Sequence, residues 1–422
     1  MILPNYIRRI KTLGFKEIVL FFLTTLFFFL NINHLSEQGI YFKTYLPIAN
    51  NLINNFSFSI SDNITATYPM WGYPVLLAIF EIIYDASLIF IFQYILCIYS
   101  LFKFFEKSKK LSTYEQIVSY IIFLFYVMLL SVKWPGAIYS FLFFMFALSH
   151  LNKEYLRAGL FLSLAYNFRS EALIFLIVYI FFIILRKKHY KIIISLALLC
   201  PWILFQFYSH GKIIPTSTNS GGVLYISLGQ LPNNKWERIH LDEEAQKYVI
   251  NKSNGEIQNP WSLEANKILS SKFKEDVIQH PDEFFKKIIY NGISSFLGGL
   301  YVTETHHIFM DNDNSQELIK YYRSNKIELL KDFFKIRSGA VSIVSLIVLE
   351  LLSILFLMYL IISNLFYLFK RKLSIDNIFM IFIGIQFIIC MLIQYQPRHI
   401  SNIIILFFFL LLTKNHYRWQ KA

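Results

Sequence analysis

Long apolar runs alternate with short charged segments along most of the 422-residue chain. A run of about 18 or more apolar residues is long enough to cross the hydrocarbon core of a bilayer as an α-helix. Ten apolar segments, several of them shorter than this, can be drawn at about 15–33, 86–105, 113–131, 136–151, 156–168, 171–185, 191–209, 339–369, 376–394 and 399–413. The pattern predicts an all-α polytopic membrane protein with a bundle of about 10 transmembrane helices, within a range of nine to twelve.

Two further apolar segments are too short to span. Treating residues 72–84 as a full crossing would turn the lysine-rich segment 103–110 outward, so we expect an interfacial or re-entrant piece there. Residues 288–302 contain three glycines and predict an interfacial helix under an external domain. An extra pair of crossings is the alternative for that segment.

Two polar stretches interrupt the apolar pattern. Residues 34–71 are rich in Asn, Ser and Thr, and residues 210–338 have an ordinary soluble composition. A connection as long as the second is seldom an idle loop. We therefore expect an N-terminal transmembrane catalytic module (1–209), an external loop domain (210–338) and C-terminal transmembrane helices with a cytoplasmic tail (339–422).

Within the second polar stretch, amphipathic helices are expected near 262–280 and 282–291. Pro281 and the acidic pair Asp282 and Glu283 open the latter segment. Proline at the first helical position and acidic side chains in the first turn are typical of helix N-termini.

Basic residues mark one side of the predicted bundle. Twenty of them would lie together: Arg8, Arg9, Lys11, Lys16, Lys103, Lys107, Lys109, Lys110, Lys153, Arg157, Arg186, Lys187, Lys188, Lys191, Lys370, Arg371, Lys372, Lys414, Arg418 and Lys421. The short segments on the opposite side hold only Lys43, Lys133, Arg169 and Arg398. By the positive-inside rule, the basic side and both chain termini are predicted to be cytoplasmic.

The composition agrees with this topology. Hydrophobic residues make up 56% of the chain and charged residues 16%, against about 25% charged in soluble domains. This excludes a soluble enzyme, a disulfide-stapled module and a disordered protein. The net charge of +13 would suggest nucleic acid in a soluble protein. The segment 212–337 holds 16 basic and 16 acidic residues, so the surplus lies in the short loops and no nucleic-acid partner is expected.

Metal and redox chemistry find little support. Cys97, Cys200 and Cys390 lie in apolar runs without metal-ligand spacing or a disulfide pattern, and are interpreted as small hydrophobic residues. Glu304, His306 and His307 are weak candidates for a divalent cation, with an ordinary loop surface as the alternative. The cofactor is therefore unknown, a divalent cation being the one possibility.

Ionisable side chains at membrane depth are costly and therefore functional candidates. Those that cytoplasmic charge does not explain cluster near the external ends of the spans: Glu37, Lys43, Asp62, Lys133, Arg169, Glu171, Gln394 and Arg398. Arginine suits phosphate because its planar fork donates two parallel hydrogen bonds. The pattern indicates an external site for an anionic, lipid-attached substrate.

Each candidate also has a structural interpretation. Arg169 can form a purely structural ion pair with its neighbour Glu171. Arg398 can extend its charge to the membrane interface, and Lys133 can be an ordinary interface anchor.

The segment from Tyr45 to Phe80 resembles the first external loop of GT-C membrane glycosyltransferases, the group that includes protein O-mannosyltransferases and lipid A aminoarabinose transferases. A Y-x-x-x-A-x-x-L helix in that loop is matched by Tyr45, Ala49 and Leu52. The Pro-rich turn that follows is matched by Tyr68-Pro69 and Gly72-Tyr73-Pro74.

Three more segments resemble the same family, in the expected order and on the expected side. NFRSEALIF (167–175) is similar to an R-P-E-like signature at the outer end of a middle span. PTSTNSGGVLYISLGQLP (215–232) resembles the S-T-N-x-G-G stretch that opens the long external loop of bacterial members. QYQPRHISNIIILF (394–407) looks like the aromatic- and Arg-containing start of the last span.

The resemblance implies an inverting sugar transfer from a polyprenyl-phosphate-linked donor to a cell-envelope glycan, lipid or protein acceptor, on the external face of a bacterial inner membrane. A carboxylate in the first loop would act as general base, and a basic residue would hold the donor phosphate. Partners would be the polyprenyl-phosphate sugar donor, a lipid-linked or envelope acceptor, and membrane lipids.

The family's acidic residue lies three or four residues before the loop tyrosine, where this chain has Tyr41 and Phe42. Glu37, one helical turn earlier, is the first candidate base and Asp62 the second, although Asp62 can also be a turn residue. The residues expected to bind substrate or phosphate are Lys133, Arg169, Glu171, Arg398, Tyr45, Trp71 and Tyr73. For the aromatic members, an interfacial belt is the alternative role.

Two other functions remain as alternatives. An O-antigen polymerase or ligase also joins lipid-linked glycans outside the membrane with the help of external arginines. A lipid or glycolipid transporter belongs to a different class and should show paired halves and ionisable groups near the midplane. The chain shows no inverted repeat, and Glu350 is the one acidic residue deep in a predicted span.

Overall fold

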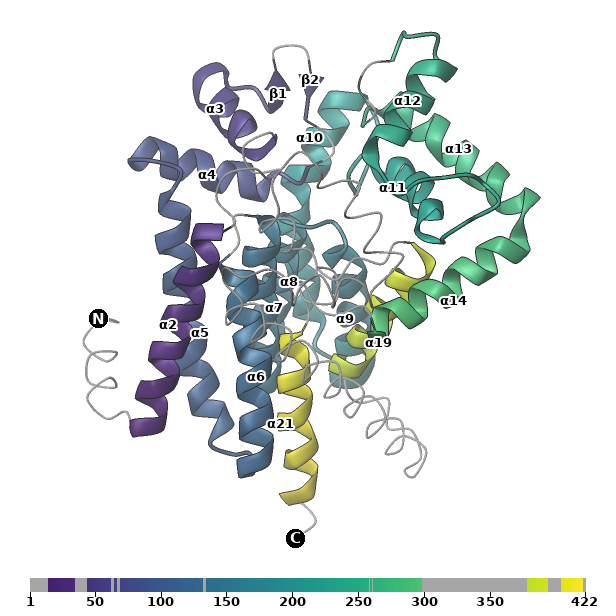
Figure 1. Ribbon diagram of the computed structural model, residues 1–422. Helices are drawn as coiled ribbons and strands as arrows, with labels where there is room; N and C mark the ends of the chain where they lie inside the picture. The colour runs from purple at the N-terminus through teal and green to yellow at the C-terminus, as the bar shows by residue number, and fades with distance from the viewer. Residues whose placement is uncertain are drawn as a thin grey trace, which may run out of the picture.

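The computed structural model describes residues 14–34, 44–61, 64–66, 69–131, 134–257, 259, 261–297, 378–393 and 404–419. This part of the chain is almost entirely helical (Figure 1). Its one pair of strands, β1 (Ser59–Ser61) and β2 (Ile64–Thr65), forms an antiparallel hairpin. The expected all-α architecture is confirmed for the described residues, apart from this hairpin.

A bundle of long helices forms the main body (Figure 1). Its members are α2 (Phe15–His34), α5 (Leu88–Ser108), α6 (Thr113–Leu130), α7 (Pro135–Leu151), α8 (Tyr155–Tyr166), α9 (Ala172–Lys187), η2 (Tyr190–Leu199), α10 (Cys200–His210), α19 (Ile378–Leu392) and α21 (Ile405–Trp419). Helix α7 is buried along nearly its whole length and packs against α5, α6, α8 and α21. Aromatic contacts join helices distant in sequence, with the Phe143 ring centroid 5.3 Å from that of Phe175 and the Phe146 ring stacked on Phe382 at 5.2 Å.

The helices differ in their capacity to span a membrane. Among the described residues, two helices are long and apolar enough for a crossing: α5, and the continuous helix Tyr190–His210 formed by η2 and α10. The shorter apolar helices are Gly72–Ile83, Thr113–Val127, Pro135–Leu151 and Ile378–Leu392. The expected span 339–369 lies outside the described residues, so the number of about ten crossings stays a prediction.

One end of the bundle gathers basic segments that are far apart in sequence. Lys109 forms an ion pair with Glu17 of α2, with 3.1 Å between Nζ and Oε1. Lys107, at the last turn of α5, donates a hydrogen bond of 3.1 Å to Asn152, which follows α7. We call this the basic end. Because α5 and α7 both end at the basic end, they run in the same sense through the bundle, and α4 and the start of α7 lie at the other end, which we call the loop end.

At the loop end, α3 (Leu46–Asn55) and the hairpin lie above α4 (Gly72–Ile83), which runs across the bundle rather than along it (Figure 1). Helix α3 begins directly after Tyr45, in the segment where the resemblance implies a helix. Asn51 donates a 3.0 Å hydrogen bond to the carbonyl of Ser59, so α3 holds the hairpin. The twelve residues of α4 extend only about 18 Å, in keeping with the expectation that residues 72–84 do not cross a membrane.

Residues 211–297, the loop domain, carry a small hydrophobic core of their own. It is formed by Tyr225, Ile226, Ala245, Val249, Ala265 and Leu269, from the helices α11 (Ser220–Ser227), α12 (Asp242–Lys252) and α13 (Leu263–Gln279). The two glycines of the S-T-N-x-G-G stretch allow α11 to approach closely. A Cβ on Gly221 would lie 2.3 Å from the backbone oxygen of Asn266, and one on Gly222 would lie 2.5 Å from the Trp261 ring.

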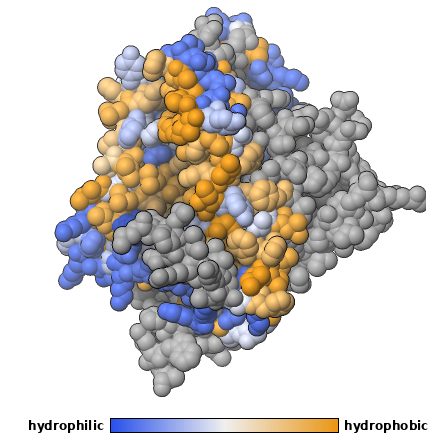
Figure 2. Space-filling view, turned by 90° about the vertical axis from the view of Figure 1, so that its left-hand side faces the viewer, coloured by the Kyte–Doolittle hydropathy of each residue, from blue (hydrophilic) through white to orange (hydrophobic). Residues whose placement is uncertain are grey.

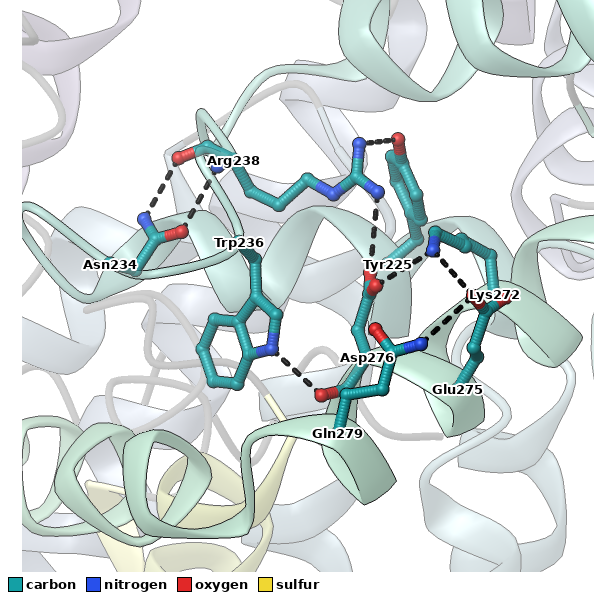
Figure 3. Close-up of polar contacts among 8 residues, drawn as sticks. All are labelled: Tyr225, Asn234, Trp236, Arg238, Lys272, Glu275, Asp276 and Gln279. Atoms are coloured by element: carbon teal, nitrogen blue, oxygen red, sulfur yellow. Dashed lines mark hydrogen bonds and ion pairs between the residues drawn. The ribbon is translucent and has the colours of Figure 1, made fainter.

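A polar network reinforces this domain (Figure 3). The Arg238 guanidinium donates to the Tyr225 hydroxyl and to Asp276, whose Oδ2 lies 3.2 Å from Nη2. Asp276 also pairs with Lys272 at 3.0 Å, and its backbone carbonyl accepts a 2.8 Å hydrogen bond from Trp236. All these groups bond to one another, so the network is a structural element of the loop domain.

Helix α14 (Pro281–Leu297) joins the loop domain to the bundle. Lys287 is fully buried and donates to the carbonyls of Leu392 (3.0 Å) and Ile393 (2.5 Å), at the C-terminus of α19. The segments expected separately at 282–291 and 288–302 are thus parts of one helix as far as it is described. Carbonyls at a helix C-terminus lack intrahelical partners and attract cations, which explains the position of Lys287.

The α14–α19 junction predicts a pH-dependent stability. Burial lowers the pKa of Lys287 to about 7. An unfolded lysine titrates near 10.4, so the unfolded state binds more protons between about pH 7 and pH 10, and stability should rise with pH across that window. The melting temperature of the wild type minus that of Lys287→Met should therefore increase from about pH 7 to pH 9.5.

The matched control is Lys286→Met, which changes an exposed neighbour on the same helix. The melting temperature of the wild type minus that of Lys286→Met should not change with pH over this range. If the corresponding difference for Lys287→Met is equally independent of pH, the lowered pKa of Lys287 is contradicted.

Candidate functional site

The structure describes five of the residues proposed from sequence for the site. These are Tyr45, Trp71, Tyr73, Arg169 and Glu171. The others lie outside the described residues: Glu37, Asp62, Lys133, Arg398, Glu304, His306 and His307. Among the residues that are described, no group of three or more His, Cys, Asp or Glu side chains could hold a metal ion.

Arg169 and Glu171 form a partly buried ion pair in the turn between α8 and α9. The Arg169 Nε atom lies 3.1 Å from Glu171 Oε1, and Nη2 lies 3.3 Å from Oε2, so the pair is bidentate. Only 16% of the arginine side chain and 14% of the glutamate side chain are exposed. Glu171 also occupies the N-cap position of α9, where the helix dipole favours a negative charge.

Two aromatic rings from the start of α7 cover the guanidinium. Its central carbon lies 5.1 Å from the centroid of the Trp134 ring and 5.7 Å from that of Tyr139. At these distances the ring quadrupoles attract the cation. Trp134 directly follows the candidate Lys133 in the chain, but Lys133 itself lies outside the described residues.

Asn167 connects the first loop to this turn. Its side-chain Oδ1 accepts a hydrogen bond of 2.7 Å from the Trp71 indole, and its carbonyl accepts one of 2.8 Å from the backbone amide of Gly72. Its Nδ2 donates to the carbonyls of Ser163 (3.1 Å) and Leu198 (3.2 Å). One residue thereby fixes α4 on α8 and η2, and the N-terminus of α4 lies beside the Arg169 turn.

The tyrosines of the first loop have packing positions. Tyr73 is fully buried, and its ring meets that of Tyr45 edge to face with 5.2 Å between centroids. Trp71 is half-buried, and its indole N–H is directed at Asn167. Packing and hydrogen bonding account for the positions of both side chains, and the expected binding of substrate by Trp71 and Tyr73 stays a prediction.

A third segment of the predicted family pattern reaches the same place. The Tyr166 hydroxyl donates to the carbonyl of Pro215, the first residue of the S-T-N-x-G-G stretch. Thr218, three residues further, donates a 2.8 Å hydrogen bond to the carbonyl of Trp261. Three of the four segments that suggested the family are therefore in contact around residues 166–171. The fourth is described only from Ile404 onward.

Sequence reasoning overlooked Trp134, Tyr139 and Asn167 as parts of the site. Asn167 stands inside the segment NFRSEALIF, and its position next to a candidate arginine was a usable signal. Trp134 follows Lys133 at the end of a predicted span, where an aromatic residue is ordinary at a membrane interface. Tyr139 had no signal, because one tyrosine among 27 in an apolar chain looks like packing.

Comparison with family models, with curated proteins and with solved structures finds no match for this chain. The chemistry of the site is therefore inferred from its own residues. A guanidinium carries five N–H donors. A single carboxylate cannot accept hydrogen bonds from all five, so Arg169 can hold Glu171 and an anionic ligand together. The buried, aromatic-lined position strengthens such a contact relative to water.

The close approach at Gly72 gives a test of this arrangement. A Cβ there would lie 2.6 Å from the backbone oxygen of Asn167, which is part of a hydrogen bond and cannot move independently. Gly72→Ala should therefore lower the free energy of unfolding by about 1–3 kcal/mol and displace α4 from the Arg169 turn.

Gly384→Ala is the matched control, because a Cβ at that helical position meets nothing within 4 Å. Thermal unfolding and limited proteolysis of the first loop should change in Gly72→Ala and stay unchanged in Gly384→Ala. Equal behaviour of the two variants would show that the contact between Gly72 and Asn167 does not hold the loop.

Proposed function

We propose that this protein is a GT-C type glycosyltransferase that moves a sugar, with inversion, from a polyprenyl-phosphate-linked donor to a cell-envelope acceptor. The observation that carries the proposal is the position of Arg169, a partly buried cation where three segments with the family's pattern meet. Partial burial of a charge is costly, so a cation largely enclosed at the end of apolar helices suggests a role beyond stability.

In the proposed reaction, Arg169 binds the donor phosphate and Glu171 orients the guanidinium. The acceptor hydroxyl oxygen forms a bond to the anomeric carbon from the face opposite the phosphate, and the bond from that carbon to the phosphate oxygen breaks. The hydroxyl proton passes to a first-loop carboxylate, Glu37 or Asp62. The leaving group is polyprenyl phosphate, whose developing negative charge the guanidinium stabilises.

The same proposal places the bundle across a bilayer, and the distribution of polar and apolar side chains supports this. On α5, Gln93 is fully buried, whereas Ile91 and Ile95 on the same helix are 59% and 57% exposed. On α19, Gln386 is 1% exposed and Ile388 is 55% exposed.

The outward-facing apolar side chains are extensive. Figure 2 shows hydrophobic surface over the middle of one face of the molecule, with hydrophilic surface toward its ends. Helices that bury their polar residues and expose their apolar ones are unfavourable in water and favourable in lipid. We therefore propose a multi-pass protein of a bacterial inner membrane, with the basic end cytoplasmic and the loop end outside.

Loss of the guanidinium should weaken binding of the donor's lipid phosphate. The probe is undecaprenyl phosphate, which all such donors share, titrated onto the full chain in nanodiscs and followed by native mass spectrometry. Arg169→Lys keeps the charge but loses the bidentate geometry, and it should weaken binding roughly tenfold or more, as expected for hydrogen bonds to a charged group.

Because a lone buried Glu171 could unfold the turn, the double variant Arg169→Leu/Glu171→Leu removes both charges together. It should remain folded and lose binding to the same extent. Arg157→Ala, which removes an exposed ion pair with Glu154 at the basic end, is the control and should bind like the wild type. Unchanged binding in both Arg169 variants would refute the assigned role.

Cysteine labelling tests the proposed orientation in spheroplasts. In a Cys200→Ser background, Ser253→Cys in the loop domain should react with a membrane-impermeant maleimide added outside. Lys188→Cys, after α9, should react only after permeabilisation, since it lies at the basic end. The reverse pattern of labelling would overturn the orientation, and labelling of both sites from outside would overturn the multi-pass arrangement.

A further inference from the structure

Helix α14 has its polarity inverted relative to a helix on a soluble domain. Four polar residues spaced four apart face inward: Glu283, Lys287, Asn291 and Ser295, all between 0% and 7% exposed. Three apolar residues with the same spacing face outward: Phe285 at 63%, Ile289 at 46% and Ile293 at 54% exposed. Exposing the apolar stripe to water forgoes the favourable free energy that each of these side chains would gain on burial.

Hydrogen bonds attach the inward face to its surroundings. Lys287 donates to the last carbonyls of α19, and Asn291 donates to Gln230 at 3.1 Å and weakly to the carbonyls of Cys390 and Met391 at 3.4 Å. Ser295 donates to the carbonyl of Asn291. The helix therefore cannot rotate to bury its apolar stripe without breaking its attachment to α19.

The outward face changes character along the helix. Its first turn is charged: Asp282 pairs with Lys235 at 2.7 Å, and Lys286 is 60% exposed and paired with Glu283. The apolar residues continue toward the C-terminal half, where Gly292 lies against Met391 near the end of α19. Figure 1 shows the helix slanting from the loop domain down to α19.

The exposed apolar surface of α14 continues that of the bundle. Next to Met391, Leu392 of α19 is 44% exposed, and Ile388 one turn earlier is 55% exposed. The C-terminal half of α14 thus lies beside the last turn of α19, where the outward-facing apolar side chains of α19 end. The charged first turn of α14 lies farther from α19, among the ion pairs of the loop domain.

We propose that α14 is a membrane-docking helix, which lies obliquely in the headgroup region with Phe285, Ile289 and Ile293 in contact with lipid. The proposal rests on the bilayer placement of the bundle given under the proposed function. Its consequence is that the loop domain is held on the membrane surface, beside the end of α19. Amphipathic helices in this position bind through their apolar face, with charged residues in the aqueous layer.

Site-directed spin labelling of the full chain in lipid nanodiscs tests the docking. The background carries Cys200→Ser, since Cys97 and Cys390 are buried and should not react. Nitroxide labels at Ile289→Cys and Ile293→Cys should collide several-fold more often with oxygen, relative to a water-soluble nickel chelate, than a label at Lys274→Cys. Lys274 is the matched control because it is an exposed position on the neighbouring helix α13.

A label at Ile95→Cys, on the outward face of α5, separates the two proposals. A lipid-like ratio at Ile95 combined with a Lys274-like ratio at Ile289 and Ile293 would overturn the docking and leave the membrane-spanning bundle standing. A water-like ratio at Ile95 would overturn the bundle's placement itself. Protection of Ile289 and Ile293 from both reagents would mean that protein covers the stripe, which also overturns docking on lipid.

Discussion

The four hydrogen bonds of Asn167 hold together the region on which the candidate site depends. They join the first loop, through Trp71 and Gly72, to the ends of α8 and η2. The Arg169 turn begins two residues later, so its position follows from the same contacts. An unsatisfied buried amide would cost about 1–3 kcal/mol for each lost partner, and this makes the arrangement cooperative.

A second feature, the inward direction of polar side chains, runs through the rest of the molecule. Gln93 and Gln386 are buried in the bundle, and Lys287 and Asn291 are buried on the inner face of α14. In each case apolar side chains on the same helix are left at the surface. The outward-facing apolar side chains of α14 lie beside those of α19, and α14 is attached to the bundle through the C-terminal carbonyls of α19.

The sequence predicted most of the helical segments well. The expected ranges 15–33 and 86–105 correspond to α2 and α5, and the helix expected near 262–280 is α13. Apolar runs and helix-opening residues are local signals, so they survive without knowledge of the tertiary structure. The same local signals divided α14 into two segments, and its amphipathic period does not record that the polar face is the buried one.

The candidate site was predicted only in part. Arg169 and Glu171 stand two residues apart, and their pairing was foreseen as one of two interpretations. The contacts of Arg169 with Trp134 and Tyr139, and that of Trp71 with Asn167, join residues 30 to 96 positions apart in sequence. Such contacts depend on which helix ends meet, and no periodicity in the chain records that.

The sequence by itself determined the helical class, the apolar segments and the separation of basic from other segments, because each of these follows from residues close together in the chain. Only the tertiary structure decided that Tyr73 is a packing residue, that Asn167 fixes the first loop, and that Lys287 attaches α14 to α19. The reason is physical: burial and hydrogen-bond partnership are properties of neighbours in space. A side chain acquires them when distant helices pack together.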